Sequence, residues 1–186
     1  NQIILAKNHD SLWDYNVCNR KSFTNKNTDQ NQHLMLISDS FSGDFTKHYA
    51  IMSMLGDGFI SPLMTTLREE KQLIYGLDGN LEWFNPQVAH TRFVMSTDRK
   101  NESLLWQEFC KILQNKQWFT KERFQQIKNK NLIELEIMYK RGELTKLDEL
   151  LYPWEFIMHE EMKKMKFSDL AETIKFYIPK NFILFK

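Results

Sequence analysis

Residues 55–77 of this chain read LGDGFISPLMTTLREEKQLIYGL. The glycine turn at residues 56–58 should end a helix, because glycine readily adopts the backbone conformation that closes a last helical turn. Ser61 and Pro62 then start a second helix, since serine caps free amide groups and proline loses no hydrogen bond at the first helical position. Residues 73–81 have the composition of a strand. The segment therefore predicts a helix end, a turn, a helix and a strand in direct succession.

Three other segments have apolar runs typical of strands, and they are residues 33–41, 88–96 and 182–185. The Phe-Asn-Pro-Gln sequence at residues 84–87 should form a turn that joins residues 73–81 and 88–96 as a hairpin. In residues 88–96 one alternating face is largely apolar and the other is mixed, so one side of the sheet should see water.

The remaining periodic segments are helical, with apolar side chains at spacings of three and four. Their expected starts are at capping residues, namely Asp44, Asp98, Thr120 and Ser168. Pro153 should kink or split the helix that carries a methionine stripe, which we interpret as core. Because strands and helices cluster rather than alternate, we predict an α+β domain. It should have two layers, a mainly antiparallel sheet with helices on one face.

Composition limits the class of protein. The chain has 186 residues, of which 42% are hydrophobic and 26% charged, as in a packed globular domain. Its net charge of +1 is too small for the positive field of a nucleic-acid binder. No apolar run approaches the roughly 20 residues of a membrane span. The two cysteines are far apart and encode neither a disulfide scaffold nor a zinc ribbon. We expect no nucleic-acid partner and no membrane span, and the composition does not indicate a compartment.

The first part of the chain differs from the rest. Residues 1–32 are rich in Asn and Lys and contain only two short segments that resemble strands, residues 3–5 and 12–17. We interpret residues 1–32 as a lead-in or linker and residues 33–186 as one domain. Because the sequence begins at Asn1 without an initiator Met, we expect it to be an excerpt of a longer protein.

Candidate metal ligands are sparse. No two of the five histidines lie within one helical turn, so neither His-Glu-x-x-His nor His-x-x-Glu-His occurs. His159 is followed by Glu160, but a second imidazole is missing. Neither a Gly-x-Ser-x-Gly elbow nor a phosphate-binding loop is present. We therefore expect no metal site, no cofactor and no catalytic residue in this chain alone, and His159 with Glu160 is the place to look if zinc binds.

The pattern of residues 55–77 resembles the pitrilysin/insulinase family of zinc metallopeptidases, which includes the mitochondrial processing peptidases. Domains of that family read Leu-Gly-Gly-Gly, then Ser-Ser-Arg/Pro-Leu, then Leu-Arg-Glu-Lys-x-Gly-Leu-x-Tyr, and the order and spacing match. The resemblance continues through the hairpin and the helix after Thr120, over roughly residues 33–186. It implies the zinc-free, carboxy-terminal (inactive) type of domain, with a fold like that of LuxS and the processing peptidases, because the inverted zinc motif is absent.

The resemblance also implies partners and a site. In this family, a zinc-bearing domain and a zinc-free domain face each other around a peptide chamber. The implied partners are a zinc-bearing homologous domain, in the same chain or a separate subunit, and a peptide substrate. Two substrate-contacting residues of the zinc-free domain fall here on Arg68 and Tyr75. Arginine offers fixed donors for a peptide carbonyl, and a phenol can donate to the oxyanion formed when zinc-bound water attacks.

Spacing alone allows a structural interpretation of the same residues. Arg68 can pair with Glu69 or Glu70, and Tyr75 can be an ordinary strand aromatic with its hydroxyl at the surface. The chain also departs from the family pattern, because Gln72 replaces a glycine and an aspartate interrupts the glycine turn. Both changes alter the expected backbone, and the glycines are interpreted as turn-formers rather than ligand contacts.

Two classes of function follow. In the first, the chain is the non-catalytic half of a zinc peptidase and completes substrate binding for a zinc domain. In the second, it is a scaffold or peptide-binding subunit of the same fold without peptidase activity. A His-x-x-Glu-His sequence upstream or in a partner subunit favours the first. A sheet-based RNA binder is disfavoured, because residues 73–81 and 88–96 lack basic and aromatic residues together. Trp83 and Phe84 could face a peptide groove, although hairpin aromatics usually pack on neighbours.

Overall fold

The computed structural model describes residues 32–38, 41, 43–58, 61–85, 88–146, 148, 153–177 and 182–185. Four strands form one sheet in the order β2-β3-β1-β4, and every neighbouring pair is antiparallel. These strands are β1 (Gln32–Ser38), β2 (Gly76–Asn85), β3 (Val88–Thr97) and β4 (Phe182–Phe185). All four predicted strands are confirmed in outline. The segments at residues 3–5 and 12–17 lie outside the described residues.

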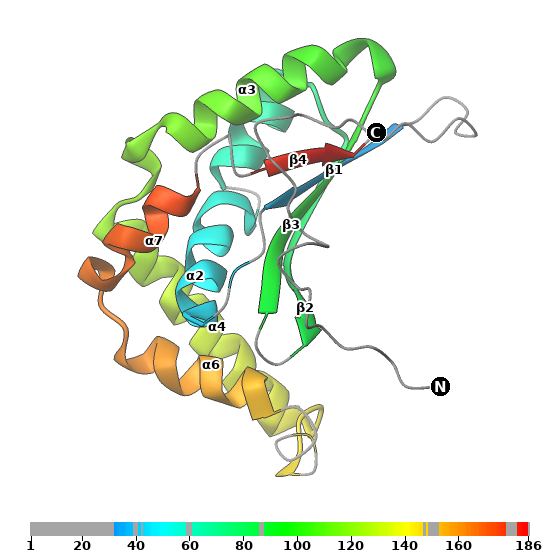
Figure 1. The fold of residues 1–186 in the computed structure, drawn as a ribbon. Coiled ribbons are helices and arrows are strands. Elements are labelled where there is room, and N and C mark those ends of the chain that lie inside the picture. The colour runs from blue at the N-terminus through cyan, green and yellow to red at the C-terminus, as the bar shows by residue number, and fades with distance from the viewer. Residues whose placement is uncertain are drawn as a thin grey trace, which may run out of the picture.

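The helices lie together on one face of this sheet (Figure 1). They are α2 (Phe45–Gly56), α3 (Glu102–Gln114), α4 (Lys121–Arg141), α6 (Pro153–Lys164) and α7 (Ala171–Phe176). Shorter helical turns are η1 (Met64–Glu70), η2 (Arg99–Asn101), η3 (Lys116–Trp118) and η4 (Phe167–Leu170). The predicted two-layer α+β architecture, with helices on one face of an antiparallel sheet, is therefore confirmed. No helix among the described residues is long and apolar enough to cross a membrane.

Helix α2 lies at the centre of the helical layer. It packs on β2 and β3 on one side and contacts α4, α6 and α7 on the others. Its residues from Ala50 to Leu55 are all at most 4% exposed, which explains why the segment is apolar on more than one face. The apolar stripe predicted for this helix, at a spacing of three and four, includes fewer residues than the structure buries.

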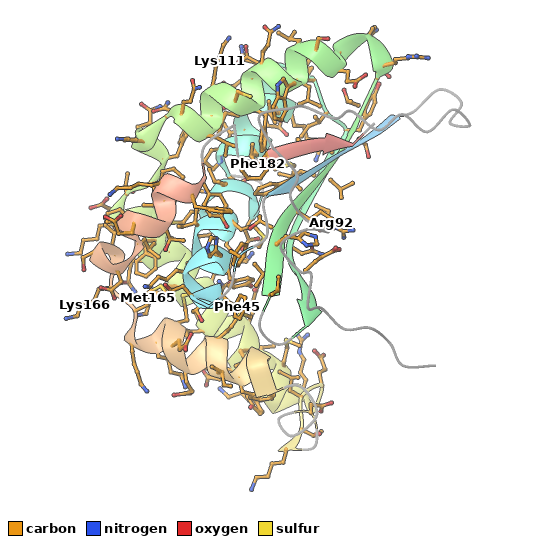
Figure 2. The ribbon with its side chains drawn as sticks, viewed as in Figure 1. Phe45, Arg92, Lys111, Met165, Lys166 and Phe182 are labelled. Atoms are coloured by element: carbon orange, nitrogen blue, oxygen red, sulfur yellow. The ribbon has the colours of Figure 1, made fainter. Side chains whose placement is uncertain are left out.

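The hairpin predicted at residues 84–87 is present, with Asn85 of β2 opposite Val88 of β3. Along β3 the residues from Ala89 to Thr97 that alternate toward the helices are buried, and Phe93 is fully so. Arg92 lies on the opposite face, as Figure 2 shows. It pairs there with Glu82, with Nη1 2.8 Å from Oε1. One face of the sheet is thus apolar and packed, and the other carries polar residues, as the alternation predicts.

An aromatic cluster joins the last strand to the core. The ring of Phe182 lies 5.5 Å from that of Phe109 on α3 and 6.1 Å from that of Phe93 on β3, measured between centroids. These contacts bury 97% of Phe182. Packing of this kind explains why a strand of only four residues closes the sheet.

Several predicted helix starts differ in detail. Thr120 caps α4 as expected, since its Oγ1 accepts a hydrogen bond from the Arg123 amide at 3.1 Å. Asp44 precedes α2 in a left-handed conformation (φ 47°) and makes no side-chain cap, because its carboxylate pairs with Lys47. Pro153 is the first residue of α6, at the position where the sequence predicts a kink or split.

The remaining two caps are also corrected. Ser168 lies inside η4 rather than before it, and the carboxylate of Asp169 accepts from the Lys166 amide at 2.8 Å. Asp98 precedes the turn η2 rather than the α-helix and makes no side-chain cap. A carboxylate three residues into the turn replaces the predicted serine at η4 because it can reach back to the free amide.

Candidate functional site

Arg68 lies near the end of η1. Ser61 starts this segment, and its Oγ accepts a hydrogen bond from the Met64 amide at 3.2 Å, as predicted. The predicted helix is present, and its residues Met64–Glu70 are π-helical. The Arg68 side chain is 42% exposed, and its Nε lies 3.7 Å from Oε1 of Glu69. An exposed ion pair of this length is weak, so the guanidinium is available to a ligand.

A tight turn connects Arg68 to the sheet. The Leu73 amide donates to the Leu67 carbonyl at 2.7 Å, and Gln72 has a positive φ of 53°. Leu73 and Ile74 are each 5% exposed, which fixes the turn to the core. The strand β2 therefore begins at Gly76 and not at residue 73, a correction to the predicted boundary. A left-handed residue at position 72 also explains why the resembling family has glycine there.

Tyr75 follows this turn and is 60% exposed. Its amide donates to the Ser96 carbonyl at 2.8 Å, so its backbone is already tied to β3. Its phenol donates to Oδ1 of Asp98 at 2.9 Å. This hydrogen bond and the negative charge of Asp98 raise the pKa of Tyr75. The phenol therefore keeps its proton at neutral pH and can act as a hydrogen-bond donor.

A buried carboxylate anchors the turn to α3. Glu108 is 5% exposed, and its Oε2 lies 3.2 Å from Nζ of Lys71, which is in the turn between Arg68 and Tyr75. Its Oε1 accepts from Nζ of Lys111 at 2.6 Å. The hydrogen bond from Lys111 is the main cause that lowers the pKa of Glu108. The two donors thus flank a turn that is held at both ends.

These contacts define what the region can do. It presents a cationic guanidinium and a neutral phenol, both exposed and both able to donate hydrogen bonds. Each has a partner within the chain, Glu69 for Arg68 and Asp98 for Tyr75. Neither group is a nucleophile or a base at neutral pH. The arrangement suits binding of oxygen acceptors rather than proton transfer.

One known protein family matches more than half of this chain. A model of the peptidase M16 inactive domain matches residues 16–131. The chain belongs to this family. The match starts before residue 33, and the division into residues 1–32 and 33–186 stays a prediction. No curated protein matches the sequence.

Solved structures share the fold of this M16 inactive domain. The inactive peptidase domain of a proposed zinc protease from Bordetella parapertussis is 16% identical, with a TM-score of 0.62 over 83% of this chain and 91% of that one. A peptidase M16 inactive domain from Pseudomonas fluorescens is 13% identical, with a TM-score of 0.60 over 84% of this chain and 40% of that one. The first half of the periplasmic protease PqqL from Escherichia coli is 12% identical, with a TM-score of 0.59 over 88% and 40%. The chain thus spans two fifths of the last two structures, and the likeness shows the fold.

The glycine turn of this M16 inactive domain is structural. Gly58 has a positive φ of 78°, which favours glycine. A Cβ at Gly56 would lie 3.0 Å from the buried ring of Phe93. Between them, Asp57 pairs with Nζ of Lys130 on α4 at 2.6 Å. The aspartate that departs from the family pattern therefore ties the turn to α4. The side chains of Trp83 and Phe84 lie outside the described part of the structure.

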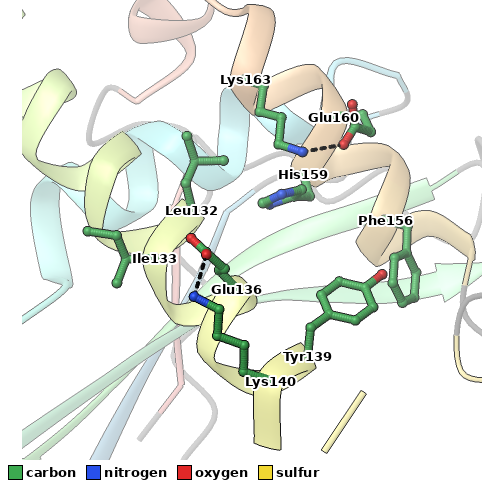
Figure 3. Close-up of a pocket in the computed structure, with 9 residues that line it drawn as sticks. All are labelled: Leu132, Ile133, Glu136, Tyr139, Lys140, Phe156, His159, Glu160 and Lys163. Carbon is green, nitrogen blue, oxygen red and sulfur yellow. Dashed lines mark hydrogen bonds and ion pairs between the residues drawn. The ribbon is translucent and has the colours of Figure 1, made fainter. Parts of the chain in front are cut away.

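Metal ligands do not gather in the described part of this domain. No group of three or more His, Cys, Asp or Glu side chains there could hold a metal ion. His159 and Glu160 line a cavity between α4 and α6, and Glu160 pairs with Lys163 (Figure 3). That neighbourhood lacks the converging ligands that zinc requires. Zinc in a partner domain stays a prediction.

A buried polar network was missed from the sequence. The phenol of Tyr177 donates to the His48 carbonyl at 3.0 Å and lies 2.8 Å from Oγ1 of Thr91 and 3.2 Å from Nδ1 of His48. The His48 ring stacks on Phe41 with centroids 3.5 Å apart and meets Phe176 edge-on. The network ties α2, β3 and the end of α7 together. Only the tertiary fold brings these residues together, so no local sequence pattern predicts their contacts.

Asp98 was predicted as a helix cap and not as the partner of Tyr75. A signal for the pairing is present in the hairpin register, because Gly76 lies opposite Ser96. Antiparallel strands continue in opposite directions, so the residue before Gly76 must approach the residues after Ser96. A register assignment from the hairpin turn could therefore have found Asp98.

Proposed function

We propose that this chain is the non-catalytic half of a zinc metallopeptidase. In this proposal Arg68 and Tyr75 bind peptide in a chamber that a zinc-bearing homologous domain completes. The observation that carries the proposal is the pair of exposed hydrogen-bond donors that flank one anchored turn. Membership of the M16 inactive-domain family supports it, because the name of the family refers to a domain without activity of its own.

The two side chains have different roles in this proposal. The Arg68 guanidinium binds a carbonyl or carboxylate of the peptide. The Tyr75 phenol turns from Asp98 to the oxyanion that forms on the scissile carbonyl. Both acceptors are negatively charged oxygens, so one strong hydrogen bond replaces another. Zinc in the partner domain would supply the activated water.

A second function has support from the same contacts. The hydrogen bond from Tyr75 to Asp98 and the pairing of Arg68 with Glu69 are also what a purely structural role requires. In that case the chain is a scaffold or peptide-binding subunit of the same fold without peptidase activity. Kinetics of single substitutions separate the two functions.

The test is peptide turnover by the two-domain protein, with kcat and KM fitted separately. Tyr75→Phe removes one oxyanion donor and should lower kcat by about a hundredfold. Arg68→Ala removes a charge-assisted hydrogen bond to the peptide and should raise KM about tenfold or more. Matched controls are Tyr139→Phe and Arg141→Ala, which remove the same groups from exposed positions on α4.

The controls should leave both constants unchanged. Unchanged kinetics in Tyr75→Phe and Arg68→Ala as well, with the fold intact by circular dichroism, would leave the scaffold function. Loss of turnover in the controls to the same extent would show that the substitutions act through folding and not through the chamber.

A further inference from the structure

His159 and two methionines of α6 line a cavity of about 250 Å³, which is separate from the cavity that His159 shares with Glu160. The walls of this second cavity come mainly from α4 and α6, and Tyr49 of α2 lines it as well. Three of the eight side chains that line it are methionine, whereas methionine makes up only nine of the 186 residues of the chain. Methionine is therefore concentrated at this cavity.

Two sulfur atoms and one imidazole come from neighbouring positions on α6. Met158 and Met162 are four residues apart, and His159 and Met162 are three apart. Side chains at these spacings are neighbours on a helix, with Cβ atoms about 5–6 Å apart. Figure 3 shows the ring of His159 between α6 and α4. Because methionine has three rotatable bonds, its sulfur can turn toward that ring. The three side chains can therefore direct their donor atoms to one point.

A third sulfur comes from the opposite helix. Met138 of α4 lines the same cavity, three residues after Leu135. Met138 is 37% exposed and Met162 is 2% exposed. The sulfur donors thus extend from the surface into the core, so a small ion has a path past Met138 to Met162.

The donor atoms determine which ion this cavity suits. Thioether sulfur is a soft, uncharged ligand that selects Cu(I), and imidazole also binds copper. Among the described residues that line the cavity there is no carboxylate and no thiol. Glu160 lines the other cavity, where its Oε1 lies 2.6 Å from Nζ of Lys163. Because uncharged ligands do not neutralise an ion, a singly charged ion is less costly to bury here than a divalent one.

Packing alone does not require sulfur at these positions. Leucine has nearly the same volume as methionine, and Leu135 and Leu144 line other parts of the same cavity. In the described part of the chain, the His, Cys, Asp and Glu side chains that zinc prefers do not form a group of three. Thioethers and an imidazole, in contrast, do share one cavity.

We propose that this cavity binds one Cu(I) ion through the thioethers of Met138, Met158 and Met162 and the imidazole of His159. The bound ion joins α4 to α6 and stabilises the folded chain. This metal site is independent of the proposed peptide chamber, because neither Arg68 nor Tyr75 lines the cavity.

The test is an anaerobic calorimetric titration of the full chain with Cu(I). Cys18 and Cys110 are first replaced by serine, because thiolates also bind Cu(I). This parent should bind one ion per chain. Met158→Leu and Met162→Leu each remove a thioether at nearly constant volume and should each weaken binding about tenfold or more. The matched control is Met165→Leu, which lies just after α6, is 8% exposed and does not line the cavity. It should bind Cu(I) as the parent does.

X-ray absorption at the copper edge identifies the ligands directly. The parent should show sulfur neighbours together with an imidazole, and Met158→Leu should show fewer sulfur neighbours. Met158 is only half-buried, so its replacement keeps the test valid if Met162→Leu fails to fold by circular dichroism. No uptake of Cu(I) by the parent at about 100 μM, where even weak sites fill, overturns the proposal. Folded Met→Leu variants that bind as tightly as the parent, or a copper shell without sulfur, overturn it as well.

Discussion

Acidification should destabilise this fold through one buried histidine. His48 is 6% exposed, stacked on Phe41 and bonded within the Tyr177 network. Burial lowers the pKa of His48 from 6.5 to about 4, with smaller effects of Asp44, which raises it, and Lys47, which lowers it. The histidine is therefore neutral in the folded chain at every pH above about 4. The unfolded chain takes up a proton on it below pH 6.5.

This difference sets the sign and the size of the effect. Between pH 6.5 and 4 the unfolded state binds more protons, so the free energy of unfolding falls as the pH is lowered. From pH 7 to pH 4.5, the loss from this group alone is about 2.5 kcal/mol. Below about pH 4 both states are protonated and no further loss comes from His48.

The assay is urea unfolding of the chain at several pH values between 7 and 4.5, followed by circular dichroism. His48→Gln should flatten the decline by about 2.5 kcal/mol relative to the wild type, whatever its stability at pH 7. The matched control is His159→Gln, because burial lowers the pKa of His159 as well but at a half-exposed position. If the free energy of unfolding of His48→Gln fell with pH in parallel with that of the wild type, the role of His48 would be refuted. A folded-state His48 pKa above 6, measured by NMR, would refute it as well.

Substitutions at Gly79, Gln72 and Tyr177 test the packing. Gly79→Ala puts a Cβ 2.9 Å from the buried Phe93 ring and should lower the free energy of unfolding by about 1–3 kcal/mol. Gly76→Ala, with open space around it, should be nearly neutral, and equal urea midpoints for the two variants would contradict the clash. Gln72 has a positive φ, which glycine adopts without strain. Gln72→Gly should therefore raise the free energy of unfolding by up to about 1 kcal/mol and with it the melting temperature, whereas Gln72→Val should lower both. No gain from glycine would mean that the turn is not strained. Tyr177→Phe leaves buried partners unsatisfied and should cost about 1–3 kcal/mol in urea unfolding, and a neutral result would argue against the network.

The sheet could be predicted from the sequence because its signals are local. The turn at residues 84–87 and the alternation along β3 are read within a few residues, and both set the hairpin. Ser61 and Thr120 cap because their hydroxyls need only reach an amide three residues ahead. Where the cap depends on competition with another partner, as for Asp44, the sequence did not decide it.

The candidate site was located by resemblance and could be described only by structure. Arg68 and Tyr75 were named from a motif, but the π-helical segment and the left-handed Gln72 depend on how Leu73 and Ile74 enter the core. The charge contacts of Lys71 with Glu108 join segments far apart in the chain. Tertiary packing overrides local preference at such places.

The position of β4 affects how this chain can fold during synthesis. Its residues pair with β1, the first described strand, so the first and last described strands lie side by side. A ribosome must therefore extend the chain through Phe182–Phe185 before β1 gains its second neighbour. Until then one edge of β1 stays open to pairing with other chains. Closure over so long a loop is also entropically slow, so sheet completion should come late and truncation before Phe182 should expose nascent chains to chaperones and aggregation.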